Sequence, residues 1–449
     1  MKNYKIIALQ NYGPSGTTLM HSLLDNHTKI ISLPWLYALP LYFIWDNNML
    51  NREATLKNLK DVISNSLEVL FDPSLENGDP SLLRMGKDED VVIRVDKNIF
   101  FNYFEKYFNS VENFKRRDFI IGIYVSFNKV YGNNFDENSY ISFPIHDQPK
   151  KHAKYLIEDF KDVKFLHLVR NPIQTIGSII KHINFNQQKF SLFKSVLMCS
   201  ISNIVLEKRE HWEEGFTKLY GKTPYFADNN DVETRYIKLE DVHLKNTLIM
   251  EQVCKWLEIS YEESLSESTF MGYLWHNRAE SVKSSGISKK SISQRHQQYL
   301  SKFDKYRIKL VCKSENNYFN YETYSSFDIV VLYFLLPILI ILPFKCDFII
   351  RRQVFRLKAM LKEFSNDRHP ILEWIIFDSM RNTLTGSELI KIKKKYNNQY
   401  LALISLVISI PIYLVRLISN YFSLRYMITR IWFAIIFKKN KRIKILPLE

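Results

Sequence analysis

Continuous apolar runs alternate with segments of helical apolar spacing along the first part of the chain. Near-continuous apolar runs at Ile6 to Leu9 and Val163 to Val169 are typical of strands that are buried on both faces. Each run is followed by a turn and then by a segment whose apolar residues have helical spacing. Strand, turn and helix in this order predict an α/β fold, in which helices flank a parallel sheet.

The segments between and beyond these runs predict further helices and one more strand. Helical spacing or composition is seen at residues 53–71, 98–108, 119–131, 151–160 and 247–257, and Tyr140 to Ile145 predicts a short strand. The stretch Asp72 to Asp90 contains proline and glycine and predicts an exposed connection. The apolar stretch Leu33 to Phe43 has two interpretations, core or the lining of an acceptor cleft.

The turn after the first run is rich in glycine and hydroxyl side chains. It consists of Gly13, Pro14, Ser15, Gly16, Thr17 and Thr18. Glycine lets the backbone approach a ligand closely, and free N–H groups at a helix start favour an anion. These features predict a phosphate-binding loop, and the alternative is an ordinary strand-to-helix turn. The turn lacks the lysine of a Walker A motif, which argues against ATP or GTP.

A second candidate anion site follows the second run. Arg170 ends the predicted strand, and Ser178 lies on the helix that begins after Pro172. The planar guanidinium of arginine matches the oxygens of a phosphate. The alternative is an arginine that pairs with a carboxylate at a strand end.

Composition and charge divide the 449 residues into two parts. Residues 326–449 contain 20 Lys and Arg against 8 Asp and Glu, a net charge of +12, which leaves +3 for residues 1–325. We therefore expect a globular domain at 1–325 and a basic helical region at 326–449. The first predicted strand begins by about Tyr4 and leaves no room for a signal peptide, so we expect the globular domain in the cytosol. The four cysteines are far apart and predict reduced thiols, and no metal-ligand spacing is seen.

Two apolar runs in the basic region favour a membrane over nucleic acid as its partner. Residues 329–344 and 400–415 each form an uncharged run of 16 residues, short of the roughly 20 that a spanning helix needs. The 12 Lys and Arg between them would lie outside the cell if the first run crossed once. We therefore expect monotopic or re-entrant attachment to membrane lipids at the cytoplasmic face. A pair of spanning helices and a soluble helical domain are the alternatives.

Both candidate anion segments resemble a known family. Ser15-Gly16-Thr17-Thr18 and the following residues resemble the 5′-phosphosulfate loop of sulfotransferases that use 3′-phosphoadenosine 5′-phosphosulfate (PAPS). Val169 to Pro172 with Ser178 is similar to their 3′-phosphate segment, and Tyr236 to Trp275 resembles the C-terminal half of bacterial-type sulfotransferase domains. The resemblance spans about residues 4–322. It implies the sulfotransferase fold, with the PAPS co-substrate held by Pro14 to Thr18 and by Arg170 and Ser178, and no metal.

The resemblance also implies a general base and exposes one departure. His146, 24 residues before Arg170, resembles the catalytic histidine of cytosolic sulfotransferases, and His152 has a counterpart in bacterial relatives. We prefer His146, because strand ends face the ligand crevice; the alternative for each is a surface or structural histidine. His167, inside a predicted strand, is expected to be structural. The family usually places Lys or Arg where Pro14 stands, so another cation is expected to replace it, with Lys97, Lys151 and Lys154 as candidates.

Together these features predict a membrane-associated, PAPS-dependent sulfotransferase. The acceptor is expected to be a hydroxyl of a glycan, a glycolipid or another cell-envelope molecule, because the protein is expected to lie at a membrane. A P-loop kinase and a catalytically inactive nucleotide-binding membrane protein are the alternatives.

Overall fold

The computed structural model describes a little over half of the chain and divides it into two compact units. The first unit consists of Met1–Val169, Lys218–Ser293 and Ile436–Glu449, and the second of Arg170–Thr217 and Gln294–Ile435. The described residues are 4–10, 15–34, 38–49, 52–75, 80–136, 138–145, 150–160, 162–175, 177–178, 190–191, 233–276, 286–288, 292, 300–311, 313–331, 383–384 and 443–446.

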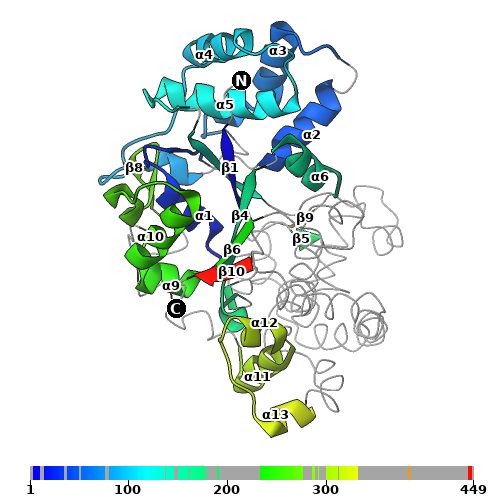
Figure 1. Ribbon diagram of the computed structural model, residues 1–449, viewed down its shortest axis with the longest axis vertical. Helices are drawn as coiled ribbons and strands as arrows, with labels where there is room; N and C mark the ends of the chain where they lie inside the picture. The colour runs from blue at the N-terminus through cyan, green and yellow to red at the C-terminus, as the bar shows by residue number, and fades with distance from the viewer. Residues whose placement is uncertain are drawn as a thin grey trace, which may run out of the picture. The chain divides into compact units, whose positions relative to one another are not determined.

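A six-stranded sheet forms the centre of the first unit (Figure 1). Its strand order is β10-β6-β4-β1-β3-β2, and all five pairs of neighbours are parallel. The strands are β1 (Lys5–Gln10), β2 (Ile30–Ile31), β3 (Tyr140–Ile145), β4 (Val163–Val169), β6 (Glu233–Lys238) and β10 (Ile443–Leu446). The three strands expected from the sequence are therefore confirmed, and so is the α/β fold class.

Helices cover both faces of this sheet, which explains why the central strands β1, β3 and β4 consist mostly of apolar residues. One face packs against α1 (Thr17–Leu24), α9 (Leu239–Leu244) and α10 (Asn246–Leu257), and β1 contributes Ile7 and Leu9 to it. The other face packs against α2 (Ala38–Met49), α5 (Arg116–Val130) and α6 (Lys150–Asp159), and here β1 contributes Ile6 and Ala8.

Further helices enlarge the core on the sheet face that α2, α5 and α6 cover. The helices α3 (Leu56–Ser66) and α4 (Lys97–Asn109) join this core, as do Leu33, Leu41 and Tyr42.

The stretch Asp72 to Asp90 was expected to be exposed, but its described part contains the short helix η2 (Pro80–Leu83) and buries Leu82 and Met85. Met85 also pairs with Val91 in an isolated β-bridge, which draws this stretch against the core. Glycine and proline therefore marked the turns correctly but hid the buried residues between them.

A small hairpin completes the first unit. It consists of β7 (Thr269–Phe270) and β8 (Tyr273–Leu274) and follows the short helix η4 (Glu263–Ser266) in the chain. The strand β7 packs against α1. Phe270 and Trp275 from this segment are buried in the core on the sheet face that α2, α5 and α6 cover.

In the second unit, the structure describes α11 (Lys302–Val311), α12 (Lys313–Tyr318), α13 (Ser326–Val330) and a strand pair of β5 (Phe190–Ser191) with β9 (Thr383–Leu384). Most of the expected basic helical region, including residues 332–344 and the whole apolar run 400–415, lies outside the described residues. Within the described part of the chain, no helix has both the length and the apolar character needed to cross a bilayer.

The strand β10 was not expected from the sequence. It pairs in parallel with β6, with Leu446 opposite Ile237, and so forms one edge of the sheet. The boundary expected at residue 325 stays a prediction, but residues 443–446, which were assigned to the basic region, belong to the sheet of the first unit.

Candidate active site

The central strand of the sheet leads directly into the expected phosphate-binding loop. Gln10, the last residue of β1, pairs with Ile145 of β3 on one side and with His167 of β4 on the other. The connection order reverses at this strand, because β2 and β3 lie to one side of β1 and β4 and β6 to the other. In open α/β sheets, ligands bind outside the carboxyl ends of strands at such a reversal. The loop therefore starts where this fold places its ligands.

Gly16 occupies a position that disfavours any residue with a side chain. It is the N-cap of α1, with φ 91° and ψ 18° in the left-handed region. A Cβ atom placed on it would clash with Cδ1 of Leu239. Leu239 is the first residue of α9, directly after β6. The loop is thus pressed against the carboxyl end of a second strand, a contact that no sequence signal announced.

The loop presents hydroxyl groups beside a helix start that has no side-chain cap. Gly16 offers no capping side chain, and the first α-helical backbone bond from it runs from the Met20 N–H to its carbonyl, at 3.0 Å. Ser15 and Thr17 are buried, and their hydroxyl oxygens lie 3.3 Å apart, whereas Thr18 is exposed. Uncapped N–H groups and adjacent hydroxyls are the donors that bind a phosphate at a helix N-terminus. Three of the predicted residues are thereby brought together around one helix start.

The rest of α1 is firmly held, so that the loop has a rigid support. The Ser22 hydroxyl lies 2.5 Å from that of Ser268. Asp25, which follows the helix, accepts hydrogen bonds from Ser32, from Thr269 and from the Gly272 N–H. Burial raises the pKa of the Asp25 carboxyl, and these hydrogen bonds partly oppose that rise. The end of α1 is in this way fixed to the β7–β8 hairpin.

The histidines near the loop have structural surroundings. His21 on α1 is buried against Phe270, and burial lowers its pKa to about 4. His27 is also buried, and its ring nitrogens lie 2.9 Å from the Ser260 carbonyl oxygen and 3.0 Å from the Lys29 N–H nitrogen. His167 is fully buried, as expected, and stacks on Tyr236 with ring centroids 4.5 Å apart. Burial lowers the pKa of His167 to about 3, so its ring is neutral at physiological pH.

The arginine segment has the local structure that its sequence predicted. Arg170 directly follows β4 and is half-buried. Asn171 begins a helix, because its Oδ1 accepts a hydrogen bond from the Ile173 N–H at 2.9 Å, and Pro172 occupies the first helical position. Ser178 lies on this helix and is also half-buried. Arg170 and Ser178 belong to the second unit and the loop to the first, so a joint site stays a prediction.

The remaining predicted residues are placed only in part. Pro14 and His146 lie outside the described residues. His152, Lys151 and Lys154 are on α6, but the structure describes only their backbone. Lys97 begins α4, and its Nζ lies 5.6 Å from the centroid of the Phe71 ring. The choice of base and of the cation that replaces the missing lysine or arginine therefore stays a prediction.

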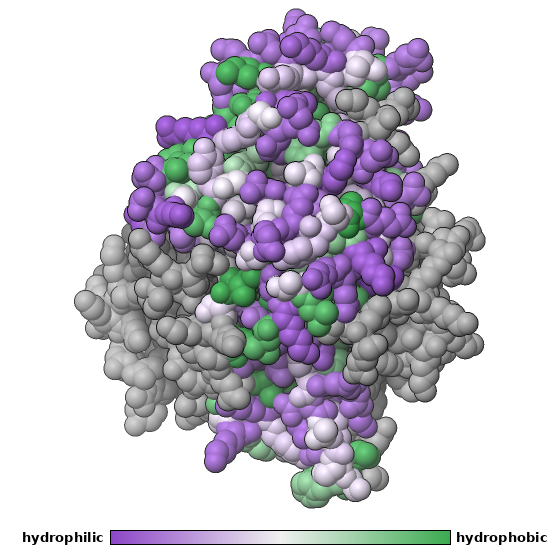
Figure 2. Space-filling view, turned by 60° about the vertical axis from the view of Figure 1, so that its left-hand side comes forward, coloured by the Kyte–Doolittle hydropathy of each residue, from purple (hydrophilic) through white to green (hydrophobic). Residues whose placement is uncertain are grey.

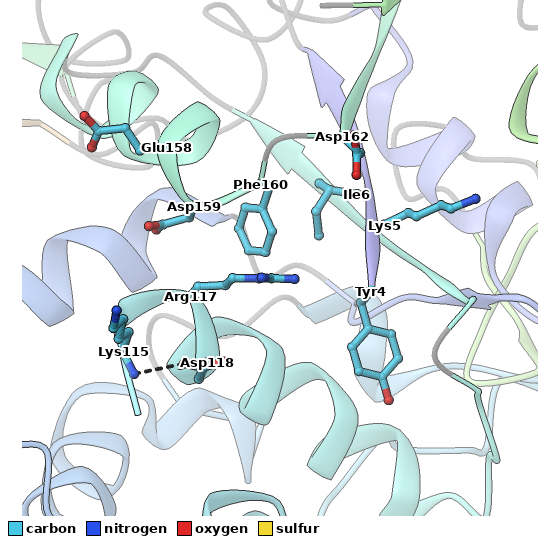
Figure 3. A pocket seen from close by; sticks show the side chains of 10 residues that line it. All are labelled: Tyr4, Lys5, Ile6, Lys115, Arg117, Asp118, Glu158, Asp159, Phe160 and Asp162. Atoms are coloured by element: carbon cyan, nitrogen blue, oxygen red, sulfur yellow. Dashed lines mark hydrogen bonds between the residues drawn. The ribbon is translucent and has the colours of Figure 1, made fainter. Parts of the chain in front are cut away.

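A cleft of about 340 Å³ opens at the amino-terminal ends of the strands, beside the start of β1. Figure 3 shows the Arg117 side chain stretched across it, below the Phe160 ring and beside Tyr4. Carboxylates and cations both line the cleft, and Asp159 is already held by two hydrogen bonds from Arg116, each 2.8 Å long. Asp159 of this cleft is thus already paired within the protein. The cleft lies at the amino-terminal ends of the strands, opposite to the carboxyl ends where this fold binds ligands. Among the described residues, no group of three or more His, Cys, Asp or Glu is placed to hold a metal ion.

A parallel sheet with a glycine and hydroxyl turn after its central strand is typical of α/β proteins that bind ligands at the carboxyl ends of their strands. The chain belongs to the sulfotransferase family, whose model matches residues 14–263, more than half of its length. The match includes the loop from Pro14 onward, the Arg170 segment and α10. Members of this family transfer a sulfuryl group, generally with PAPS as the donor.

Solved structures with similarity to the chain are also sulfotransferases. The sulfotransferase domain of the Synechococcus olefin synthase is 15% identical, with 72% of this chain and 98% of that domain covered and a TM-score of 0.37. The corresponding domain from the curacin biosynthetic pathway is 16% identical, with 72% and 99% covered and a TM-score of 0.36. A Mycobacterium avium sulfotransferase is 13% identical, with 59% and 66% covered and a TM-score of 0.29. No curated protein matches the chain.

Proposed function

We propose that this protein transfers a sulfuryl group from PAPS to a hydroxyl of a glycan, a glycolipid or another cell-envelope acceptor, at the cytoplasmic face of a membrane. The observation that supports the donor best is the start of α1. In a member of the sulfotransferase family, the helix that follows the central strand begins with a left-handed glycine, an uncapped N-terminus and neighbouring hydroxyl groups.

The residues of the loop fit the phosphosulfate end of PAPS. The left-handed backbone of Gly16 starts the helix without a side-chain cap, so that the N–H groups of its first turn can bind an anion, and the Ser15, Thr17 and Thr18 hydroxyls add donors. Such donors stabilise the charge that develops on the oxygens during an in-line transfer, and the reaction needs no covalent enzyme nucleophile. Pro14 supplies neither a side-chain cation nor a backbone N–H. The proposal therefore needs a cation from elsewhere in the chain.

Arg170 and Ser178 are proposed to hold the 3′-phosphate at the other end of the donor. Arg170 follows β4, which is the direct neighbour of β1 in the sheet. A guanidinium with a neighbouring hydroxyl suits a dianionic phosphate because both are hydrogen-bond donors. His146, or in its place His152, is proposed to take the proton from the acceptor hydroxyl as a general base.

The membrane part of the proposal rests on the sequence of the basic region. Its net charge of +12 suits anionic headgroups, and its apolar runs of 16 residues suit monotopic or re-entrant attachment. Attachment at a membrane makes a lipid-linked or envelope acceptor the most economical choice. Two spanning helices remain the alternative form of attachment.

The decisive experiment incubates the full chain in membranes with PAPS labelled in its sulfuryl group. Label that enters a lipid or glycan fraction supports the proposal. Turnover of ATP with no response to PAPS would favour a kinase instead. Binding of 3′-phosphoadenosine 5′-phosphate without any transfer would identify an inactive nucleotide-binding protein.

The variant Arg170→Ala tests the second phosphate contact. Loss of a charged hydrogen bond should weaken the binding of 3′-phosphoadenosine 5′-phosphate by about 1.5–3 kcal/mol, measured by titration calorimetry. Arg94→Ala is the matched control, because Arg94 is exposed and lies 3.6 Å from Asp72 in another segment. Equal affinities of the two variants would refute the role of Arg170.

A further inference from the structure

The short helix α13 is fixed to its own unit by its polar residue. The Ser325 hydroxyl accepts a hydrogen bond from the Asp328 N–H at 3.2 Å, and the Asp328 carboxylate accepts one from the Ser325 N–H at 2.8 Å. The same carboxylate lies 3.3 Å from Nζ of Lys309 on α11. Asp328 is therefore held from two directions and is only 7% exposed.

The apolar residues of this helix face the solvent instead. Phe327 is 69% exposed, Val330 52% and Ile329 39%. Figure 2 shows hydrophobic side chains at the surface over α13, at the lower end of the view. A surface helix in a water-soluble protein normally has the reverse arrangement, with apolar residues inside and charged residues outside.

The reversal is built into the helix rather than an accident of one side chain. Rotating α13 about its axis to bury Phe327 would bring Asp328 out and break its contact with Lys309 on α11. Contiguous exposed apolar side chains on a rigid element mark a surface that another phase or partner covers.

The chain itself indicates what covers this surface. Ile329 is the first residue of the uncharged apolar run that continues to Phe344, and the region from residue 326 onward has a net charge of +12. A phenylalanine and aliphatic residues beside abundant Lys and Arg are the composition that binds the boundary between headgroups and acyl chains. We propose that α13 docks on an anionic phospholipid membrane through Phe327, Ile329 and Val330. This inference rests on the membrane attachment in the proposed function and names the surface that makes the contact.

Site-specific photocrosslinking tests this docking on the full chain. The substitution Phe327→p-benzoylphenylalanine places a reactive ketone at the proposed contact. Phe43→p-benzoylphenylalanine is the matched control, because Phe43 is the same residue type and is 59% exposed on α2 in the first unit. Both proteins are reconstituted in vesicles of phosphatidylcholine, with or without phosphatidylglycerol, and lipid adducts are measured by mass spectrometry after illumination.

The proposal expects lipid adducts at position 327 to exceed those at position 43 by about tenfold in vesicles with phosphatidylglycerol, since only the first site would reach the acyl chains. Equal yields at the two positions would overturn it. Adducts of position 327 with another polypeptide in cell membranes, and none with lipid, would also overturn it and identify a protein partner.

The same preparations separate this inference from the proposed function. Sulfuryl transfer from PAPS is measured on each before illumination. Transfer without lipid adducts at position 327 would refute the docking of α13 alone. Lipid adducts without transfer would refute the proposed activity and leave the docking in place.

Discussion

The helices α1 and α13 are both short, but they differ in how their N-termini are capped and in whether their apolar residues are buried. The N-terminus of α1 begins at a glycine without a side-chain cap, and most of its side chains are buried. The N-terminus of α13 is closed by the reciprocal Ser325–Asp328 capping box, and its apolar residues are exposed. The helix without a side-chain cap is thus the buried one, and the helix with a capping box is the one whose apolar residues are exposed.

This difference shows where each helix obtains its stability. Most side chains of α1 are buried, so packing holds this helix in place without a side-chain cap at its N-terminus. Because α13 buries little apolar surface, it depends on hydrogen bonds from its own polar residues. The uncapped start of α1 and the exposed apolar residues of α13 are therefore the features that support the proposed donor binding and the proposed membrane docking.

The largest expected effect comes from adding a methyl side chain at Gly16, the N-cap of α1. Gly16→Ala combines a left-handed residue, at about 1–2 kcal/mol, with a new Cβ that would clash with the Leu239 side chain unless that side chain moves, for which overpacking adds about 1–3 kcal/mol. We expect a lower unfolding temperature and a loss of sulfuryl transfer of at least about 100-fold, because the loop backbone moves. Thermal unfolding and the labelled-PAPS assay measure the two effects.

A second glycine provides the control for this variant. Gly132 has φ 79°, but a Cβ on it would meet no atom within 4 Å. Gly132→Ala should therefore cost only the backbone strain and leave transfer unchanged. If Gly16→Ala behaves like Gly132→Ala, Leu239 does not position the loop.

The next effect is a loss of stability in weak acid, which we expect from His21 of α1. His21 has a pKa of about 4 in the folded protein against 6.5 in the unfolded chain. The unfolded chain therefore binds more protons between these values, and stability falls as the pH falls from 6.5 to 4. At about 1.4 kcal/mol per pKa unit, the loss is about 3 kcal/mol. His21→Gln should reduce this loss in urea titrations at both pH values, and an unchanged pH dependence would contradict the burial of a neutral His21.

The carboxylate of α13 should respond at much lower pH. Backbone hydrogen bonding from Ser325 lowers the pKa of Asp328 to about 2, below its ordinary value of 3.8. Its contribution to stability is therefore present above 3.8 and is lost as the pH falls through 2. We expect the amides of α13 to keep their protection from hydrogen exchange at pH 4, where the surroundings of His21 are already weakened. Loss of both at the same pH would show that the two helices unfold together.

The smallest expected effect concerns the cap of α13. Ser325→Ala removes the hydroxyl that accepts from the Asp328 N–H, at a cost of about 1 kcal/mol to the helix. Hydrogen exchange of the Ile329 amide, which donates to the Ser325 carbonyl, should speed up by about fivefold. Ser326→Ala, one residue further on and outside the capping box, serves as the control and should leave this exchange unchanged.

Much of the sheet and of the loop could be predicted from the sequence because their signals are local. The apolar runs gave β1 and β4, and glycine with serine and threonine gave the start of α1. Arg170, Asn171 and Pro172 likewise predicted a strand end followed by a helix. Each of these features depends on residues that are close together in the chain.

The features that sequence reasoning missed depend on distant residues. Nothing near Gly16 indicates that Leu239 presses on it, and the hairpin that receives Asp25 lies more than 240 residues away. The sequence also did not predict that α13 buries Asp328 and exposes its apolar residues, because the order of polar and apolar residues does not determine which side of the helix faces solvent. Such pairings are decided by tertiary packing, which local patterns do not encode.

The strand β10 has a consequence for how the protein is made. During synthesis, β6 leaves the ribosome long before residues 443–446 exist, and in that interval one edge of the sheet exposes unpaired backbone groups. A nascent chain in this state can recruit strands from its neighbours, so its yield should depend on chaperones and on slow expression. A fusion placed near residue 446 would disturb the same edge, whereas the opposite edge, at β2, forms early.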